Sequence, residues 1–108
     1  MLAQETIINE LKKRFKPQAA KDITAAYLIN IKGEKGGAWL LSINNGELNV
    51  TEYQEGEAYN CKLSINAEDM AMIIEGRMSA MTAALSGVLS VEGDLGQAMK
   101  LVPIFFEG

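Results

Sequence analysis

The first apolar pattern along the chain has the spacing of a helix. Its apolar residues recur with a period of 3.6 residues and so share one helical face: Ile7, Ile8, Leu11 and Phe15. Acidic residues stand early in this segment and basic residues late, which is the order that the helix dipole favours. Pro17 is expected to end the helix, because proline cannot continue one.

From Thr24 the period changes to two, which predicts β-strands. Alternating apolar and polar positions run through residues 24–31, 39–43, 48–50 and 59–65. The glycine-rich stretch between the first two runs and an Asn-Gly pair before the third are turn signals. Four strands joined by short turns predict an antiparallel meander with one apolar face.

Helical signals return after the fourth strand. Asn66 is suited to cap a helix that Gly76 ends, and Ser79 to cap a second that Gly87 ends. A short fifth strand follows over residues 88–91. The sequence therefore predicts an α+β domain: a five-stranded, mainly antiparallel sheet with helices covering one face.

The last helix is predicted from a capping pair. Asp94 and Gln97 have the spacing of a helix cap, and apolar residues follow with helical spacing until Pro103. Phe105 and Phe106 are expected to dock on the body of the domain, because two adjacent aromatic rings are poorly hydrated. They are candidates for a lid over the interior or for a partner interface.

Composition excludes most catalytic classes. The 108 residues contain no histidine, which removes Ser-His-Asp triads, Cys-His pairs and histidine metal sites. Cys61 is the single cysteine and alternates inward, so we expect a buried apolar side chain, with no disulfide, thiolate metal site or other cofactor. The formal net charge of −4 argues against nucleic acid as a partner. The sequence thus predicts a protein that is not an enzyme.

No targeting or membrane-spanning segment is evident. Gln4 and Glu5 stand where a secretory signal carries basic residues, and no apolar run approaches ~18 residues. The last residues do not form a peroxisomal Ser-Lys-Leu type ending. A single cysteine also fits a reducing compartment, so we expect a cytoplasmic location.

Residues 70–101 supply an unusual number of flexible apolar side chains, including five of the six methionines. Methionine adapts to irregular apolar shapes. Opposite an apolar sheet face, these side chains could enclose a cavity for a hydrophobic small molecule, or they could simply fill a core. Periodicity does not separate the two, because core and cavity lining have the same pattern.

Three segments resemble the sterol carrier protein-2 domain family. They are Trp39-Leu40-Leu41-Ser42-Ile43-Asn44-Asn45-Gly46, Asn60-Cys61-Lys62-Leu63-Ser64-Ile65, and the stretch Leu85-Ser86-Gly87-Val88-Leu89-Ser90-Val91-Glu92-Gly93-Asp94 that continues to Leu101. The last resembles the family's F-x-G-x-L-x-I-x-G-(D/N)-x-x-x-A-x-K-L pattern and departs from it at Leu85, where the family often has an aromatic residue. The resemblance covers nearly the whole chain.

The resemblance implies a single lipid-binding domain over residues 1–108, with sheet and helices enclosing an apolar tunnel. Such domains bind and transfer fatty acids, fatty acyl-CoA, phospholipids or sterol-like molecules without catalysis. The apolar residues expected to line the tunnel are Tyr27, Ile29, Trp39, Leu41, Leu48, Val50, Leu63, Met70, Ile73, Met78, Met81, Leu85, Met99 and Leu101.

A lipid head group needs water or a cation, because an unpaired buried charge is costly. The candidates for that cation are Arg77, Lys100, Arg14 and Lys16. The basic cluster of residues 12–16 could also touch an anionic membrane, but against a net charge of −4 this contact is at most weak and transient. A homodimer is also compatible with the sequence.

A second hypothesis belongs to a different class. The chain would be an accessory or scaffold subunit with a filled core, serving a lipid- or quinone-modifying enzyme. It would present either a lipid-like site or the other sheet face, which carries Ala26, Leu28 and Leu40. The volume of the internal cavity separates the two hypotheses, since pockets for small molecules usually measure several hundred Å³.

Overall fold

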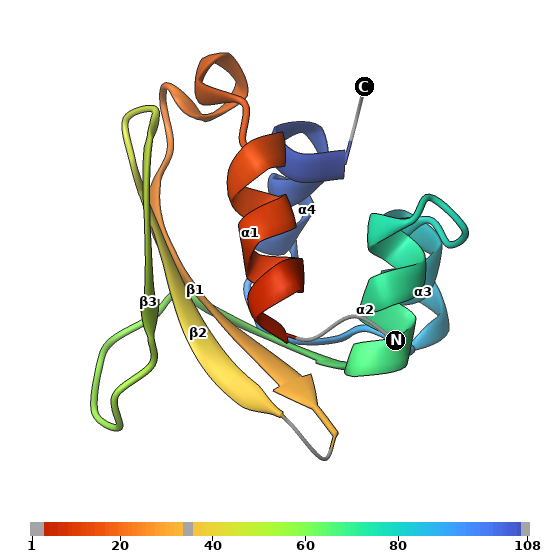
Figure 1. Ribbon diagram of the computed structural model, residues 1–108. Helices are drawn as coiled ribbons and strands as arrows, with labels where there is room; N and C mark the ends of the chain where they lie inside the picture. The colour runs from red at the N-terminus through yellow and green to blue at the C-terminus, as the bar shows by residue number, and fades with distance from the viewer. Residues whose placement is uncertain (1–3, 34–35, 107–108) are drawn as a thin grey trace.

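A five-stranded sheet with its helices on one face forms the frame of the molecule (Figure 1). The computed structural model describes residues 4–33 and 36–106. In chain order its elements are α1 (Gln4–Arg14), the short 3₁₀ helix η1 (Pro17–Ala20), β1 (Thr24–Lys32), β2 (Gly37–Asn44), β3 (Glu47–Glu52), β4 (Cys61–Asn66), α2 (Ala67–Ile74), α3 (Ala80–Ser86), β5 (Ser90–Gly93), α4 (Leu95–Met99) and the π-helical turn η2 (Val102–Phe106). The predicted order of helices and strands is confirmed.

The strand order β3-β2-β1-β4-β5 corrects the predicted meander. β1, β2 and β3 are antiparallel neighbours, but β4 pairs with β1 in parallel, placing Tyr27 beside Cys61 and Ile29 beside Leu63. β5 then pairs antiparallel with β4. One pair out of four is therefore parallel, and the sheet is mixed but mainly antiparallel, as the predicted fold class has it.

The connection over residues 53–60 makes this parallel pairing feasible. It joins β3 to β4, three inter-strand spacings away, or about 14 Å. In Figure 1 it leaves β3 on the side of the sheet opposite the helices. On that same side of the sheet, Leu28 and Leu40 lie opposite each other in β1 and β2, and both are buried. The exposed apolar face that the scaffold hypothesis predicted here is therefore largely covered.

The helix starts follow most of the predicted caps. The Ser79 hydroxyl accepts a 3.3 Å hydrogen bond from the Thr82 N–H, and the Asp94 carboxylate accepts one of 3.3 Å from the Gln97 N–H. Asn66 occupies the N-cap position of α2, but its side chain makes no capping hydrogen bond. These caps fix where each helix leaves the sheet, and so which side chains it turns inward.

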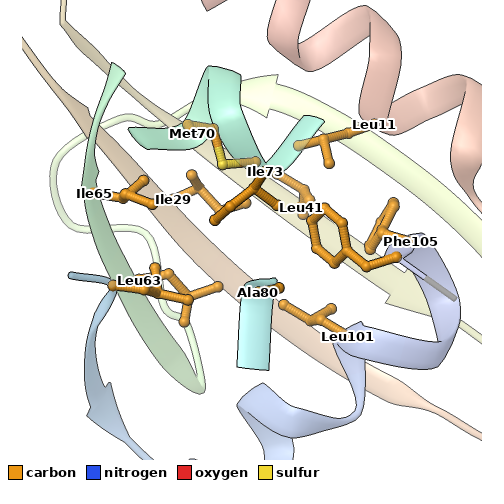
Figure 2. Close-up of a pocket in the computed structure, with 12 residues that line it drawn as sticks. Leu11, Ile29, Leu41, Leu63, Ile65, Met70, Ile73, Ala80, Leu101 and Phe105 are labelled. Atoms are coloured by element: carbon orange, nitrogen blue, oxygen red, sulfur yellow. The ribbon is translucent and has the colours of Figure 1, made fainter. Parts of the chain in front are cut away.

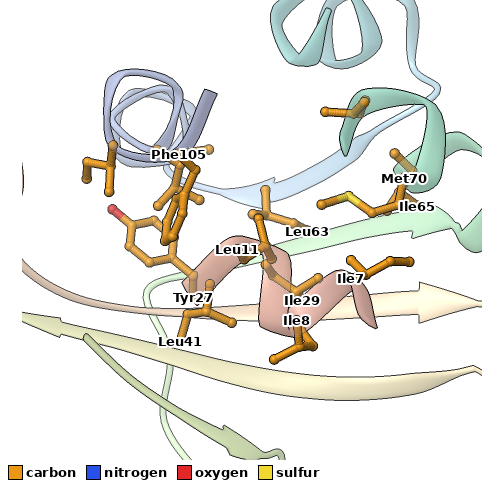
Figure 3. Packing of buried hydrophobic residues seen from close by; sticks show 14 of the residues in the cluster. Ile7, Ile8, Leu11, Tyr27, Ile29, Leu41, Leu63, Ile65, Met70 and Phe105 are labelled. Atoms are coloured by element: carbon orange, nitrogen blue, oxygen red, sulfur yellow. The ribbon is translucent and has the colours of Figure 1, made fainter. Parts of the chain in front are cut away.

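The main core lies between the sheet and the helices (Figure 3). α1 turns Ile7, Ile8 and Leu11 toward the sheet, as its spacing predicts. From the sheet, Tyr27 and Ile29 of β1 point into the same cluster. Because side chains alternate along a strand, every second residue of β1, β2 and β4 faces this layer. An internal ligand site would therefore lie in the space between the two layers.

Candidate functional site

A small apolar cavity of about 40 Å³ lies between the sheet and the helices (Figure 2). All the residues that line it are apolar: Leu11, Ile29, Leu41, Leu63, Ile65, Met70, Ile73, Ala80, Leu89, Leu101, Phe105 and Phe106. No carboxylate, amide or cation is among them. The cavity is therefore suited to hydrocarbon and unsuited to water, which needs polar partners.

Both halves of the chain build the walls of this cavity. The sheet contributes Ile29 and Leu41 from β1 and β2, and the alternation of β4 adds Leu63 and Ile65. The opposite walls come from α1, α2, α3 and the C-terminal turn η2. Figure 2 shows the Ala80 side chain reaching the cavity from α3. No single element encloses the space, so its volume depends on how the two layers are held apart.

The cavity is too small in this structure to hold a lipid. Pockets that hold a drug-sized molecule begin at about 300 Å³, several times the volume found here. The predicted tunnel is thus represented by its apolar lining rather than by an open passage. A long apolar ligand could enter only if one wall moved outward.

The wall that η2 forms is tied to the body at two points. The backbone N–H of Lys16 donates a 3.1 Å hydrogen bond to the Ile104 carbonyl. The ring of Phe105 packs against Phe15 with 5.8 Å between ring centroids. Phe105 is buried and Phe106 half-buried, and both rings line the cavity. The predicted docking of these two rings on the domain is confirmed.

Comparison with models of known protein families shows to which family the chain belongs. Residues 8–106 match the model of the SCP-2 sterol transfer family. The chain belongs to this family. Membership associates this SCP-2 domain with the binding or transfer of lipids or sterols in general, and it confirms the resemblance found in the sequence motifs.

Solved structures share the fold. A crystal structure of sterol carrier protein 2 like 2 from Aedes aegypti superimposes with a TM-score of 0.75 at 20% identity, covering 95% of this chain and 96% of that one. A solution structure of palmitated SCP2L2 from the same organism gives a TM-score of 0.79 at 21% identity, covering 98% and 96% of the two chains. At these identities the likeness shows the fold alone.

Curated relatives are much longer proteins. "Hydroxysteroid dehydrogenase-like protein 2" of Xenopus tropicalis is 29% identical over 94% of this chain, which spans 23% of that protein. "Peroxisomal multifunctional enzyme A" of Dictyostelium discoideum is 33% identical over 78% of this chain and 19% of its own length. "Sterol carrier protein 2" of Gallus gallus is 28% identical over 88% and 18%. The SCP-2 domain therefore spans about a fifth of these relatives, two of which are named as enzymes or enzyme-like proteins.

The structure brings six of the fourteen predicted lining residues to the cavity. They are Ile29, Leu41, Leu63, Met70, Ile73 and Leu101. Of the others, Tyr27 is fully buried in the core, and five are half-buried away from the cavity: Trp39, Leu48, Val50, Met78 and Met99.

Two predicted lining residues lie on the surface instead. Met81 is 40% exposed and Leu85 is 78% exposed. Both are on α3, which turns the small residues Ala80 and Ala83 inward. The prediction assumed that the largest apolar side chains of this helix face the core, and the structure reverses that assignment.

Six residues that line the cavity are not among the fourteen that the sequence predicts. They are Leu11, Ile65, Ala80, Leu89, Phe105 and Phe106. The apolar spacing of α1 and the alternation of β4 contained the signal for Leu11 and Ile65. No sequence signal indicated Ala80, because alanine has a small side chain that occurs on both buried and exposed faces of helices.

None of the four predicted head-group cations lines the cavity. Arg77 and Lys100 are exposed, while Arg14 and Lys16 are half-buried. Arg14 donates a hydrogen bond to the Ile74 carbonyl at the end of α2 and lies 3.6 Å from a carboxylate oxygen of Glu10. This guanidinium therefore holds α1 against the C-terminus of α2, where the helix dipole favours a cation.

A buried polar cluster lies beside the first turn of α4. The Tyr27 hydroxyl donates a 3.0 Å hydrogen bond to the Gln97 carbonyl, and the Cys61 thiol lies 3.6 Å from the Asp94 carbonyl. Burial is the main cause that raises the pKa of the Tyr27 hydroxyl, with Cys61 and Asp94 adding to it. Burial and then Asp94 raise the pKa of the Cys61 thiol as well. Both groups are thus held in their neutral forms, so Cys61 is a poor nucleophile.

This cluster predicts a loss of stability in alkali. Cys61 and Tyr27 keep their protons in the folded state beyond pH 9.0 and 10.0, where free side chains lose them. The unfolded chain then binds fewer protons, so the free energy of unfolding falls as pH rises above about 9, by at most about 1.4 kcal/mol per pH unit for each group. Urea unfolding between pH 7 and about pH 10 measures this slope.

The matched variant for this prediction is Cys61→Ala. It removes one of the two titrating groups and should give a shallower alkaline slope than the unchanged protein. Parallel slopes for the two proteins would contradict the assignment to Cys61.

Two classes of site are not found in the described part of the chain. Residues 4–33 and 36–106 contain no group of three or more cysteine, aspartate or glutamate side chains placed to hold a metal ion. None of their helices has the length and apolar character needed to cross a membrane.

Proposed function

We propose that this SCP-2 domain binds the hydrocarbon part of a lipid, such as a fatty acid, fatty acyl-CoA, phospholipid or sterol-like molecule, between its sheet and its helices, without catalysing a reaction. The observation that carries the proposal is the cavity with an entirely apolar lining at the centre of the two layers. Its volume of about 40 Å³ is that of a packed core rather than of an open pocket, so the proposal rests on the apolar lining together with the family membership, and it requires one wall to move outward.

Binding requires the cavity to expand, and α3 is the wall best suited to give way. It has seven residues and reaches the cavity through Ala80 alone, so little buried surface holds it there. The turn η2 is held more firmly, because Ile104 and Phe105 are both buried and the Lys16 N–H donates a hydrogen bond to the Ile104 carbonyl. Segments with few buried contacts open at the lowest free-energy cost.

The expected gain is large enough to support opening. Burying ~400 Å² of an acyl chain contributes on the order of 10 kcal/mol before the costs of association and rearrangement. A wholly apolar lining does not recognise polar groups, so binding should tolerate different tails. A carboxylate or phosphate head would stay at the surface, where water solvates it.

Palmitate is a suitable probe, since the related structure from Aedes aegypti is described as palmitated. A ligand that binds only the folded state at about 100 times its Kd stabilises it by about 2.7 kcal/mol. For a domain of this size we expect the melting temperature to rise by roughly 10 °C. Native mass spectrometry should show one palmitate adduct.

Butyrate is the matched control, because it carries the same carboxylate without a long tail. It should leave the melting temperature unchanged. An unshifted melting temperature with palmitate, together with no adduct, would contradict the proposal.

A second candidate function rests on the lengths of the relatives. Since this domain spans about a fifth of relatives such as "Hydroxysteroid dehydrogenase-like protein 2", it could serve as an accessory unit that presents a lipid to an enzyme. Retention of the chain by such an enzyme in the absence of lipid would favour this role over independent transport.

A further inference from the structure

The segment of residues 78–91 combines two features that are rarely found together. It contains no charged residue over fourteen positions, although the chain as a whole is 22% charged. It also carries three of the five large apolar side chains that are exposed in the described residues: Met81, Leu85 and Val88. Leu85 is the most exposed of the five at 78%, and a group of exposed apolar side chains is informative where a single leucine is not.

The same segment forms part of the cavity wall. Ala80 and Leu89 line the cavity, and Ala83 is buried on the inner side of α3. Met81 and Leu85 are four residues apart and so lie on one side of α3. In Figure 1 α3 lies beside α2 at the side of the molecule away from β3. A single layer of chain therefore separates an exterior apolar patch from the interior cavity.

We propose that Met81, Leu85 and Val88 form a docking surface for the hydrocarbon edge of a lipid bilayer. This inference rests on the proposed function and deepens it, because the patch is the outer side of the wall that a lipid would cross. Contact with the bilayer would give α3 an apolar environment in which to move outward. A ligand could then pass between membrane and cavity without crossing water.

The size of the patch argues against a second protein chain as the occupant. Three side chains offer far less than the ~800 Å² per partner that a specific protein interface buries. A bilayer needs no complementary shape, and shallow insertion of a few apolar side chains gives weak, reversible binding that scales with buried apolar area. Such reversibility suits a carrier that must leave again.

The charges nearby predict what kind of membrane contact this is. The uncharged segment is bounded by Arg77, which pairs with Glu75 at 3.7 Å, and by Glu92, which pairs with Lys62 at 3.8 Å. The chain as a whole has a net charge of −4. Docking should therefore be driven by apolar contact, with no gain from anionic lipid and little sensitivity to salt.

The test is flotation of the full chain with phosphatidylcholine vesicles at low and high salt. We expect the unchanged protein to bind at both, and added phosphatidylserine not to strengthen binding. Leu85→Ser should weaken binding about tenfold, because one leucine side chain no longer enters the hydrocarbon. The matched control is Tyr59→Ser, which removes a side chain of 42% exposure in the connection between β3 and β4 and should leave binding unchanged.

Three results would overturn the docking surface. They are vesicle binding by Leu85→Ser equal to that of the unchanged protein, binding that is lost at high salt, or a dimer in analytical ultracentrifugation that Leu85→Ser dissociates. The palmitate melting shift, measured without vesicles, keeps the two proposals apart. If palmitate raises the melting temperature of the unchanged protein and of Leu85→Ser equally, lipid binding is supported even if docking fails. If flotation depends on Leu85 but palmitate does not shift the melting temperature, docking alone is supported.

Discussion

Replacing Phe105 with alanine should lower the melting temperature by about 15 °C. The ring is buried, packs against Phe15 and forms part of the cavity wall. A buried phenylalanine truncated to alanine typically costs 3–5 kcal/mol, since transfer energy is lost and a void remains, and each kcal/mol shifts the melting temperature of a domain of this size by about 4 °C. Thermal unfolding followed by circular dichroism measures the change.

The same substitution should also increase the response to lipid. It enlarges the cavity beside an apolar lining, so palmitate should raise the melting temperature of Phe105→Ala by more than that of the unchanged protein. Phe106→Ala is the matched control, because this neighbouring ring is only half-buried and its removal should cost less. Equal losses for the two variants would contradict the assignment of Phe105 as the ring that contributes more to stability.

Replacing Ala80 with leucine should reduce palmitate affinity at least tenfold while the protein stays folded. The three added carbon atoms point into a space of about 40 Å³ and occupy the room that a lipid tail needs. The void accepts part of the added volume, so the usual 1–3 kcal/mol cost of overpacking should be reduced. Titration with a fluorescent fatty acid and its displacement by palmitate measure the affinity.

Thr82→Leu provides the control for Ala80→Leu. It introduces the same side chain on the same helix at an exposed position that does not line the cavity. Its palmitate affinity should equal that of the unchanged protein. Normal affinity in Ala80→Leu would show that the lipid binds elsewhere.

Local patterns were sufficient for the part of the site that comes from regular elements. Alternation along the strands placed Ile29, Leu41 and Leu63 on the inner face, and helical spacing placed Met70 and Ile73 there. On the strands, burial of one face fixes the register and therefore which residues point inward. The volume of the cavity could not be predicted from such patterns, because it depends on the distance between the sheet and the helices.

The errors of prediction have identifiable physical causes. The glycine turn near Gly56 resembles that of a hairpin, but the connection of residues 53–60 is long enough to carry β4 past β2 to the far side of β1. On α3, the spacing of Met81 and Leu85 marks an apolar side without saying whether it faces the core or the solvent. Alanines such as Ala80 allow the small side of a helix to approach the interior.

The parallel pairing of β1 with β4 has a consequence for the order of folding. β1, β2 and β3 can associate through short turns, whereas Ile29 meets Leu63 only after the 33 residues between them close into a loop. Non-local contacts of this kind form slowly, so we expect the rate-limiting barrier to precede complete assembly of the cavity walls. A lipid held by those walls would then prolong the lifetime of the native state and leave the refolding rate almost unchanged.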